Sequence, residues 1–498
     1  MRVEDTADVV IVGTGAGGAT AARVLSEAGL SIIMLEEGPS LAPEDRPLEL
    51  GRAMKQSLRD FATFTTAGAS PFPLLLGRCV GGGTAVNSGI IWRMPQQVGR
   101  EWKQRFGLGE LVEPAAMRRI FETIESELGV DEVRPEAIGG NGELMREGAR
   151  ALGLPGRIIQ RNAKDCRGSA RCLQGCPHGA RQSMEVSYVP FAMARGARLY
   201  ASARAEQVIV RGGRAEAVRG SLLDEPGGKP RGRFEVHARR AVIVAAGAVF
   251  SPVLLRRSGL RRLVGERFQA HPGGAVVGRF REPVGMNQGA TQSYEVPLPE
   301  RGYKIESLSL PPELLAARLP GAGRSWQRHL GRLGHYAQWC ALVRMRALGR
   351  VRPSWFSGGA SVRYSPEPRD LRKLQDGLAT IVRMMFAAGA EEVYPGVAGL
   401  PTPLTHPAQA ELVDRADLGA SDVRLVASHH FGTNCASALP ARGVVGAALE
   451  SHDVRALYVM DASVFPTNMG VNPQHTIMAL AWRASERLAN QERLKRRA

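Results

Sequence analysis

Apolar and polar positions near the N-terminus follow the order of a parallel βαβ unit. Asp8–Val12 is an almost continuous apolar run, as expected of a strand that is buried on both faces. Ala19–Ala28 has the composition of a helix, and Gly29 follows it where a helix commonly ends. Leu30–Leu35 is a second apolar run. The pattern predicts an α/β protein with a doubly wound, Rossmann-like sheet.

The turn between the first predicted strand and the helix carries the glycine spacing of a dinucleotide site. Gly13, Gly15 and Gly18 form G-x-G-x-x-G, which allows a tight turn, a close backbone approach to a pyrophosphate, and close packing of helix on strand. The pyrophosphate would accept hydrogen bonds at the helix N-terminus. Glu36 ends the second strand, where an acid binds ribose hydroxyls and disfavours a 2′-phosphate. The ligand is therefore FAD or NAD, between which this fingerprint does not choose.

Length and composition limit the remaining possibilities. A chain of 498 residues suggests two closely packed domains. No apolar run approaches the roughly 20 residues of a membrane span, and no signal peptide is visible, so we expect a cytoplasmic protein. The formal net charge is +17, but the arginines that produce it are scattered rather than gathered in one stripe. We therefore expect no nucleic-acid partner.

Five further segments resemble the motifs of the glucose–methanol–choline (GMC) family of flavoprotein oxidoreductases. They are the glycine-rich Gly77–Pro95, then Arg239–Leu260, Glu266–Pro272, "SHHFGTNC" at 428–435, and Leu457–Leu488. The resemblance implies a discontinuous FAD-binding domain at 1–275 and 423–498. It implies a substrate domain of mixed sheet and helices at 276–422. The nearest members by the character of these segments are the cholesterol-oxidase-like and long-chain alcohol oxidases.

The resemblance also implies noncovalently bound FAD and a set of residues that hold it. The departure from the family pattern is Met460, where the family usually has glycine. Cys79 and Cys435 fall inside the motifs and are expected near the cofactor. The implied contacts to FAD are Gly13, Gly15, Gly18, Glu36, Gly82, Gly83, Asn87, Ser88, Val208 (near the adenine), Asp461 and Ala462.

Two polar residues are candidates for catalysis. By resemblance, His429 is the histidine beside the flavin, and Asn472 is its polar partner. Alcohol oxidation needs a base near the hydroxyl, and imidazole suits that role because its pKa lies near the working pH. His430 is expected to face away, since neighbouring side chains on a strand alternate. His475 is the rival of Asn472 as the second polar group.

Three cysteines cluster within eleven residues. Cys166, Cys172 and Cys176, followed by proline, loosely resemble an iron–sulfur segment. Similar stretches occur in gluconate- and glucose-type GMC dehydrogenases, where they would relay electrons to a partner protein. They also resemble stretches of long-chain alcohol oxidases that need hold no metal, so both interpretations stay open.

The sequence thus predicts an FAD-dependent enzyme that oxidises a primary or secondary alcohol to a carbonyl. We expect an apolar small-molecule alcohol, such as a sterol, terpenoid or long-chain alcohol. One alternative is a sugar or polyol dehydrogenase with a cysteine-bound cluster. Another is a non-redox flavin-binding lyase or scaffold. The electron acceptor (oxygen, quinone or protein), the precise substrate and the oligomeric state are left open.

Overall fold

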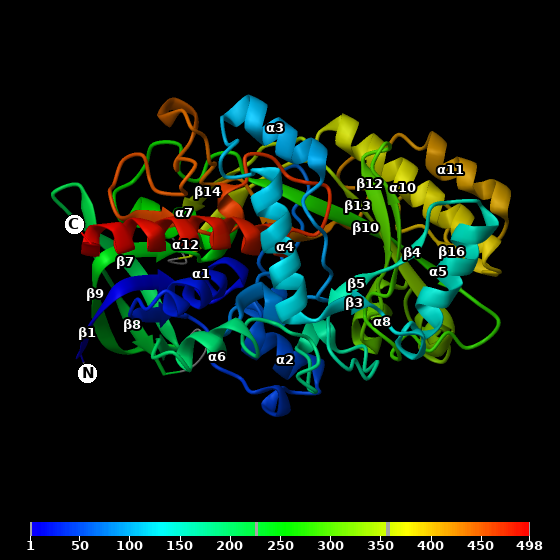
Figure 1. Ribbon diagram of the computed structural model, residues 1–498. Coiled ribbons are helices and arrows are strands. Elements are labelled where there is room, and N and C mark those ends of the chain that lie inside the picture. Colours follow the sequence, from blue (N-terminus) through cyan, green and yellow to red (C-terminus); the bar gives the residue numbers. More distant parts are fainter. Residues whose placement is uncertain (1, 225–227, 355–358, 498) are drawn as a thin grey trace.

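The chain folds around two mixed or antiparallel sheets, shown in a computed structural model that describes residues 2–224, 228–354 and 359–497 (Figure 1). The first sheet lies near both termini, and the second lies at the other end of the molecule. Each sheet has its own buried apolar cluster. A cavity lined by residues of both sheets lies where the two meet.

The first sheet has the order β6-β2-β1-β9-β8-β7, and β18 pairs with β9. Strands β6, β2, β1, β9 and β18 run parallel, whereas β7, β8 and β9 form an antiparallel meander. Parallel strands in this arrangement are covered by helices, and α1 packs against both α12 and α6. The strands are β1 (Arg2–Val12), β2 (Ile32–Leu35), β6 (Arg198–Tyr200), β7 (Ala203–Arg211), β8 (Arg214–Leu223), β9 (Pro230–Val244) and β18 (Leu457–Val459).

The first strand is longer than the apolar run that predicts it. β1 begins at Arg2 rather than Asp8, because its polar first half pairs in parallel with the first half of β9. These residues alternate between exposed and partly buried, which a search for a doubly buried strand does not detect. The helix α1 (Ala16–Glu27) also begins three residues before the predicted Ala19.

The second sheet has the order β16-β10-β13-β12-β11-β4, and β17 pairs with β10. Its neighbouring strands are antiparallel, and the long helix α10 packs against β10, β12 and β13. The strands are β4 (Arg157–Ile158), β10 (Gln269–Arg279), β11 (Tyr294–Leu298), β12 (Tyr303–Ser307), β13 (Tyr336–Val343), β16 (Glu392–Tyr394) and β17 (Val426–Phe431).

The predicted boundaries at 275 and 423 stay a prediction, but the second sheet draws on all three predicted segments. β4 and the start of β10 come from 1–275, and β17 comes from 423–498. A strand late in the chain therefore carries His429 into the second sheet. The boundaries in the sequence and the layers in space do not coincide.

None of the helices in the described ranges is both long and apolar enough to cross a membrane. The remaining elements are helices and two short two-stranded sheets. These elements are α2 (Leu50–Ser57), α3 (Gln96–Phe106), α4 (Pro114–Leu128), α5 (Gly139–Ala151), α6 (Tyr188–Met193), α7 (Gly247–Arg257), α8 (Pro312–Arg318), α9 (Arg324–Leu330), α10 (Pro368–Ala387), α11 (Ala410–Arg415), α12 (Gln474–Arg497), and the pairs β3 (Val130–Glu132) with β5 (Gln160–Asn162) and β14 (Arg350–Pro353) with β15 (Ala360–Arg363).

Candidate active site

A cavity of about 1160 Å³ is lined by residues of both sheets. It begins at the turn after β1 and extends to the start of α12. A single drug-sized ligand fills roughly 300–1,000 Å³, so this cavity has room for a dinucleotide and part of a substrate. Of the predicted site residues, it is lined by Gly13, Gly15, Glu36, Gly82, Gly83, Asn87, Ser88, His429, Asp461, Ala462 and Asn472.

The glycines of the first turn divide into two kinds. Gly13 has a φ of +96°, and a Cβ there would lie 2.3 Å from the Ala245 carbonyl oxygen. A Cβ on Gly18 would lie 2.0 Å from the Gly13 oxygen, and one on Gly17 would lie 1.7 Å from the Met460 oxygen. A Cβ on Gly15 would meet nothing within 4 Å, although Gly15 lines the cavity. Gly18 therefore serves packing, and Gly15 leaves room for a ligand.

Glu36 is held at the cavity wall by backbone and side-chain donors. Its Oε2 accepts hydrogen bonds from the Thr14 N–H (3.1 Å) and the Thr14 hydroxyl (2.8 Å), and its Oε1 accepts from the Gly38 N–H (3.0 Å). Burial raises the pKa of the Glu36 carboxyl, and these donors oppose that shift. A carboxylate has about four acceptor positions, so one position on Oε1 remains for a ribose hydroxyl.

Replacing Glu36 by alanine is expected to weaken FAD binding by about 1.5–3 kcal/mol, the usual contribution of a hydrogen bond to a charged group. The measurement is FAD affinity of the apoprotein by fluorescence titration. Asp370→Asn is the control, because Asp370 is a buried carboxylate that also accepts backbone hydrogen bonds, but outside the cavity lining. Unchanged affinity in Glu36→Ala would refute Glu36 as the ribose acid.

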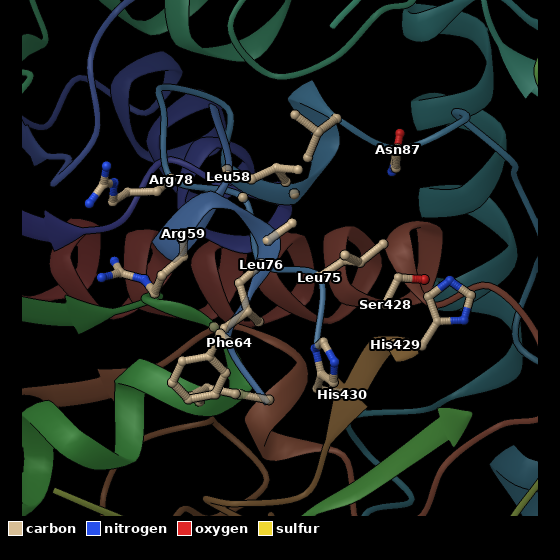
Figure 2. Close-up of a pocket in the computed structure, with 18 of the residues that line it drawn as sticks. Leu58, Arg59, Phe64, Leu75, Leu76, Arg78, Asn87, Ser428, His429 and His430 are labelled. Atoms are coloured by element: carbon tan, nitrogen blue, oxygen red, sulfur yellow. The ribbon is translucent and has the colours of Figure 1, made fainter. Parts of the chain in front are cut away.

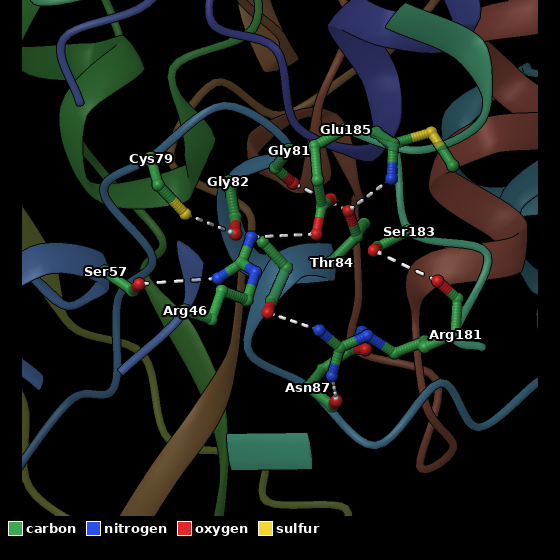
Figure 3. A network of polar contacts seen from close by, with 12 residues as sticks. Arg46, Ser57, Cys79, Gly81, Gly82, Thr84, Asn87, Arg181, Ser183 and Glu185 are labelled. Carbon is green, nitrogen blue, oxygen red and sulfur yellow. Dashed lines mark hydrogen bonds and ion pairs between the residues drawn. The ribbon is translucent and has the colours of Figure 1, made fainter. Parts of the chain in front are cut away.

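The second glycine-rich segment is fixed by buried arginines from elsewhere in the chain (Figure 3). Arg181 donates to the carbonyls of Asn87 and Ala85, and Arg161 donates to the Ser88 carbonyl (2.6 Å). The Asn87 side chain donates to Gln474 Oε1 (2.6 Å) and accepts from the Gly89 N–H (2.9 Å). The Asn87 side chain thus braces its own loop and ties it to the first residue of α12.

Two buried polar groups in the cavity wall lack partners within the described part of the chain. The Arg78 guanidinium is buried and makes no hydrogen bond or ion pair there. The Ser88 hydroxyl is buried and also has no partner. Leaving such groups unsatisfied is costly, and a guanidinium suits a phosphate anion. Together with the open space at Gly15 and the acceptor of Glu36, these groups fit a bound dinucleotide.

His429 lies on β17 and contacts a second histidine on β10. Its Nδ1 is 3.4 Å from Nδ1 of His271, and the two rings are nearly perpendicular. Burial lowers the pKa of His429 well below its ordinary value, and His271 and Lys304 lower it further. His429 is therefore neutral at neutral pH, and its Nε2 is the ring nitrogen left for a substrate.

The expectation for His430 holds only in part. Figure 2 shows the two rings pointing in different directions from β17, yet both line the cavity. The Nε2 atom of His430 lies 3.2 Å from the Ala427 carbonyl oxygen, and the His430 ring stacks on Phe268. Burial lowers the pKa of His430 to about 4. The cavity extends around the strand, which the alternation of side chains does not reveal.

Asn472 and His475 separate clearly. Asn472 lines the cavity, and its Oδ1 accepts a hydrogen bond from Lys304 Nζ (2.5 Å). His475 is fully buried beside Phe121 of α4 and does not contribute to the cavity wall. The sequence did not indicate Lys304 or Thr14 as site residues, because neither belongs to a motif that specifies a lysine or a threonine.

Three predicted neighbours of the cofactor do not themselves line the cavity. The Val208 side chain is in the core of the first sheet, and on β7 it is Ala203 and Ala205 that contribute to the cavity wall. The placement of Val208 near the adenine stays a prediction. Cys79 and Cys435 are buried but do not line the cavity, although Cys79 Sγ is 4.0 Å from the Gly82 oxygen.

Asp461 and Met460 lie against the start of α1, next to the first turn. Asp461 accepts hydrogen bonds from the Gly247 N–H (2.9 Å), the Ser463 N–H (2.8 Å) and the Ser251 hydroxyl. Burial raises the pKa of the Asp461 carboxyl. Met460 is buried in the core, and its carbonyl oxygen is the atom against which Gly17 packs.

The cysteine cluster is arranged around an arginine. Arg161 Nη2 is 3.1 Å from Cys172 Sγ, and Arg161 Nη1 is 3.8 Å from Cys166 Sγ. Burial would raise the pKa of the Cys172 thiol, but Arg161 and Arg181 lower it to about 7. Over the described ranges, no group of three or more histidine, cysteine, aspartate or glutamate side chains could hold a metal ion. The arrangement does not support the iron–sulfur hypothesis for Cys166, Cys172 and Cys176.

The fold and the cavity are those of a dinucleotide-binding protein, and comparison with known families identifies an FAD-binding oxidoreductase. Two family profiles match the chain, both described as GMC oxidoreductase: the N-terminal one at residues 7–273 and the C-terminal one at 358–481. The chain belongs to the GMC oxidoreductase family. This confirms the resemblance seen in the motifs.

Relatives of known sequence extend over nearly the whole chain. An uncharacterized GMC-type oxidoreductase of Mycobacterium tuberculosis is 38% identical over 95% of this chain and 74% of its own length. A long-chain-alcohol oxidase of Arabidopsis thaliana is 27% identical over 97% of this chain and 68% of its own length.

Solved structures show the same fold. A formate oxidase from Aspergillus oryzae has a TM-score of 0.77 at 15% identity and covers 98% of this chain and 99% of its own. A pyridoxine 4-oxidase has a TM-score of 0.73 at 17% identity, with 96% and 98% covered. The predicted α/β class and FAD as the cofactor are confirmed.

Proposed function

We propose that this protein oxidises a primary or secondary alcohol with an apolar body to the corresponding carbonyl compound. The observation that carries the proposal is a pair of polar groups, His429 and Asn472, in the wall of a cavity whose remaining lining is largely apolar. The name of the long-chain-alcohol oxidase among its relatives supports this substrate class. The apolar lining includes Leu58, Phe64, Leu75, Leu76, Phe250, Leu308, Leu310, Leu314, Leu342, Val423 and Leu425 (Figure 2).

The residues that would hold FAD line the end of the cavity next to the turn after β1. Gly15 gives the pyrophosphate room, Arg78 would neutralise it, and Glu36 would accept from the ribose. Gly82, Gly83 and Ser88 would border the rest of the cofactor. Bound FAD supplies a two-electron acceptor for the hydride that leaves the alcohol carbon.

Residues of the chain accept the proton of the alcohol and orient its hydroxyl group. Neutral His429 takes the hydroxyl proton at Nε2 as the carbon–hydrogen bond breaks, so the substrate loses a proton and a hydride and becomes a carbonyl. Asn472 holds the alcohol oxygen. The apolar walls exclude water and bind the hydrocarbon part of the substrate.

A panel of primary alcohols is expected to show chain-length selection in anaerobic flavin reduction. Each methylene placed against the apolar wall contributes about 0.8 kcal/mol, so the apparent Kd should fall roughly fourfold per carbon until the cavity is full. Flavin absorbance follows the reaction, and glucose serves as the polar control. Reduction by glucose but not by 1-decanol would contradict the substrate class.

The cysteine cluster bears on the alternative function of a sugar dehydrogenase with an iron–sulfur relay. The arrangement of the cysteines does not support that alternative, because no metal-binding group is found among the described residues. We propose a cytoplasmic location for the enzyme.

A further inference from the structure

A buried cluster of charged side chains lies beside Asn472, and one of its members, Glu306, also lines the cavity. Lys304 of β12 is only 2% exposed, and Glu295 and Glu306 beside it are each 1% exposed. Lys304 Nζ lies 2.9 Å from Glu295 Oε2, 2.5 Å from Glu306 Oε1 and 2.5 Å from Asn472 Oδ1. Burial would lower the pKa of Lys304, but the two glutamates raise it, so the ammonium stays charged.

The ammonium is fully committed in this position. Its N–H groups donate hydrogen bonds to Glu295 Oε2 and Asn472 Oδ1, and it forms an ion pair with Glu306 Oε1. Glu295 is also held by Trp92 Nε1 (3.0 Å) and Arg157 Nε (2.9 Å). Gln292 donates to the second oxygen of Glu306 (2.6 Å). Lys304 therefore has little freedom to move.

An ammonium group can donate hydrogen bonds but cannot accept them, so it fixes which end of the Asn472 amide faces it. Oδ1 must point to Lys304, and Nδ2 must point the other way. Nδ2 has no hydrogen-bond partner among the residues that the structure describes, and Asn472 lines the cavity. An N–H donor is thus presented to the ligand.

We propose that Lys304 is a positioning residue that locks the Asn472 amide so that it donates to the oxygen of the substrate alcohol. This inference rests on the proposed function. With its oxygen held by an N–H donor, the alcohol is oriented to give its own proton to His429. A reversed amide would accept that proton through Oδ1 and hold it away from the base.

The lock should affect rate more than affinity. A hydroxyl group both donates and accepts, so an alcohol can bind to either orientation of the amide. Only the donating orientation stabilises the negative charge that develops on oxygen as the proton leaves. A residue with a merely structural role would change affinity and rate together.

Replacing Lys304 by methionine tests the lock in the holoenzyme. We expect the limiting rate of anaerobic reduction by 1-octanol to fall about 10–10²-fold, the scale at which a preorganised donor is weakened, while the apparent Kd for 1-octanol changes less than about threefold. Lys373→Met is the matched control, because Lys373 lies near a buried aspartate on α10 outside the cavity wall, and it should keep the parent rate.

A binding measurement tests the amide orientation without turnover. In Asn472→Asp, Lys304 still holds one carboxylate oxygen, and the other replaces the N–H donor. Binding of 2-octanone, which only accepts hydrogen bonds, should weaken at least about tenfold, as followed by the change in flavin absorbance. If Oδ1 already faced the ligand, this substitution would leave 2-octanone binding unchanged.

The outcomes separate the two proposals. A parent enzyme that no alcohol reduces would overturn the proposed function. A parent that is reduced, with Lys304→Met at the parent rate or with rate and affinity falling together, would overturn the lock. If Lys304→Met does not fold, the double variant Lys304→Met/Glu306→Gln also removes the carboxylate charge that loses its partner when Lys304 is replaced. The same rate-to-affinity split is expected of it. If neither folds, 2-octanone binding to Asn472→Asp decides.

Discussion

Replacing His429 by alanine is expected to slow anaerobic flavin reduction by about 10²–10⁴-fold, the usual cost of losing a positioned general base. His429 lies in the cavity wall, and its Nδ1 is occupied by His271, which leaves Nε2 for the alcohol proton. His430 does not take its place directly, since its ring points in another direction from the strand. Rapid mixing with a saturating alcohol measures the effect.

His430→Ala and Asn472→Ala bracket this result. His430→Ala removes the stacking on Phe268 and should lower the melting temperature more than the rate. Asn472→Ala should lie between the two histidine variants, because the amide orients the alcohol but does not carry its proton. A larger rate loss in His430→Ala than in His429→Ala would show that the two histidines have been assigned the wrong way round.

The same environment determines how the rate depends on pH. Burial lowers the pKa of His429 well below 6.5, and a general base is active in its neutral form. The rate of flavin reduction should therefore stay level through the neutral range and decline only in acid, as His429 becomes protonated. The charged and titratable groups facing it are His271, His430 and Lys304, of which the first two also have lowered pKa values.

The parts of the site that lie close together in the sequence could be predicted well. The βαβ unit and its glycines are local, so their spacing alone places Gly13, Gly15 and Glu36 at one cavity wall. His429 and Asn472 also reach this cavity, and the motifs identify them although they belong to distant segments.

The local pattern is least informative where burial or pairing depends on distant parts of the chain. The Val208 side chain is buried in the core, and the earlier part of its strand borders the cavity. The polar start of β1 becomes a strand only because β9 pairs with it. Neither fact is contained in the local pattern of apolar residues.

Lys304 shows the same limit at the site itself. A single lysine in the middle of the chain has no motif around it, and its position 168 residues from Asn472 gives no hint of contact. It becomes significant because β11 and β12 bring two glutamates and a lysine together beneath the start of α12. Such a cluster can be found only once the second sheet is assembled.

Gly15→Ala and Gly17→Ala are expected to fail in opposite ways, although the two glycines are two residues apart. A methyl group on Gly15 meets nothing within 4 Å in the protein, so the chain should fold with nearly the parent melting temperature as apoprotein. That methyl group would occupy the space that the pyrophosphate needs, so FAD affinity should fall about tenfold or more, which is at least ~1.4 kcal/mol.

A methyl group on Gly17 would instead lie 1.7 Å from the Met460 carbonyl oxygen, and neither backbone can yield easily because α1 is packed against α12. Overpacking of this kind costs about 1–3 kcal/mol, and more where backbone is the obstacle, so the apoprotein itself should lose stability. Thermal unfolding and FAD titration of both apoproteins separate the effects. A stable Gly15→Ala protein that binds FAD like the parent would place the pyrophosphate elsewhere than over the first turn. An unstable Gly15→Ala apoprotein would show that this glycine is needed for folding, as we expect of Gly17.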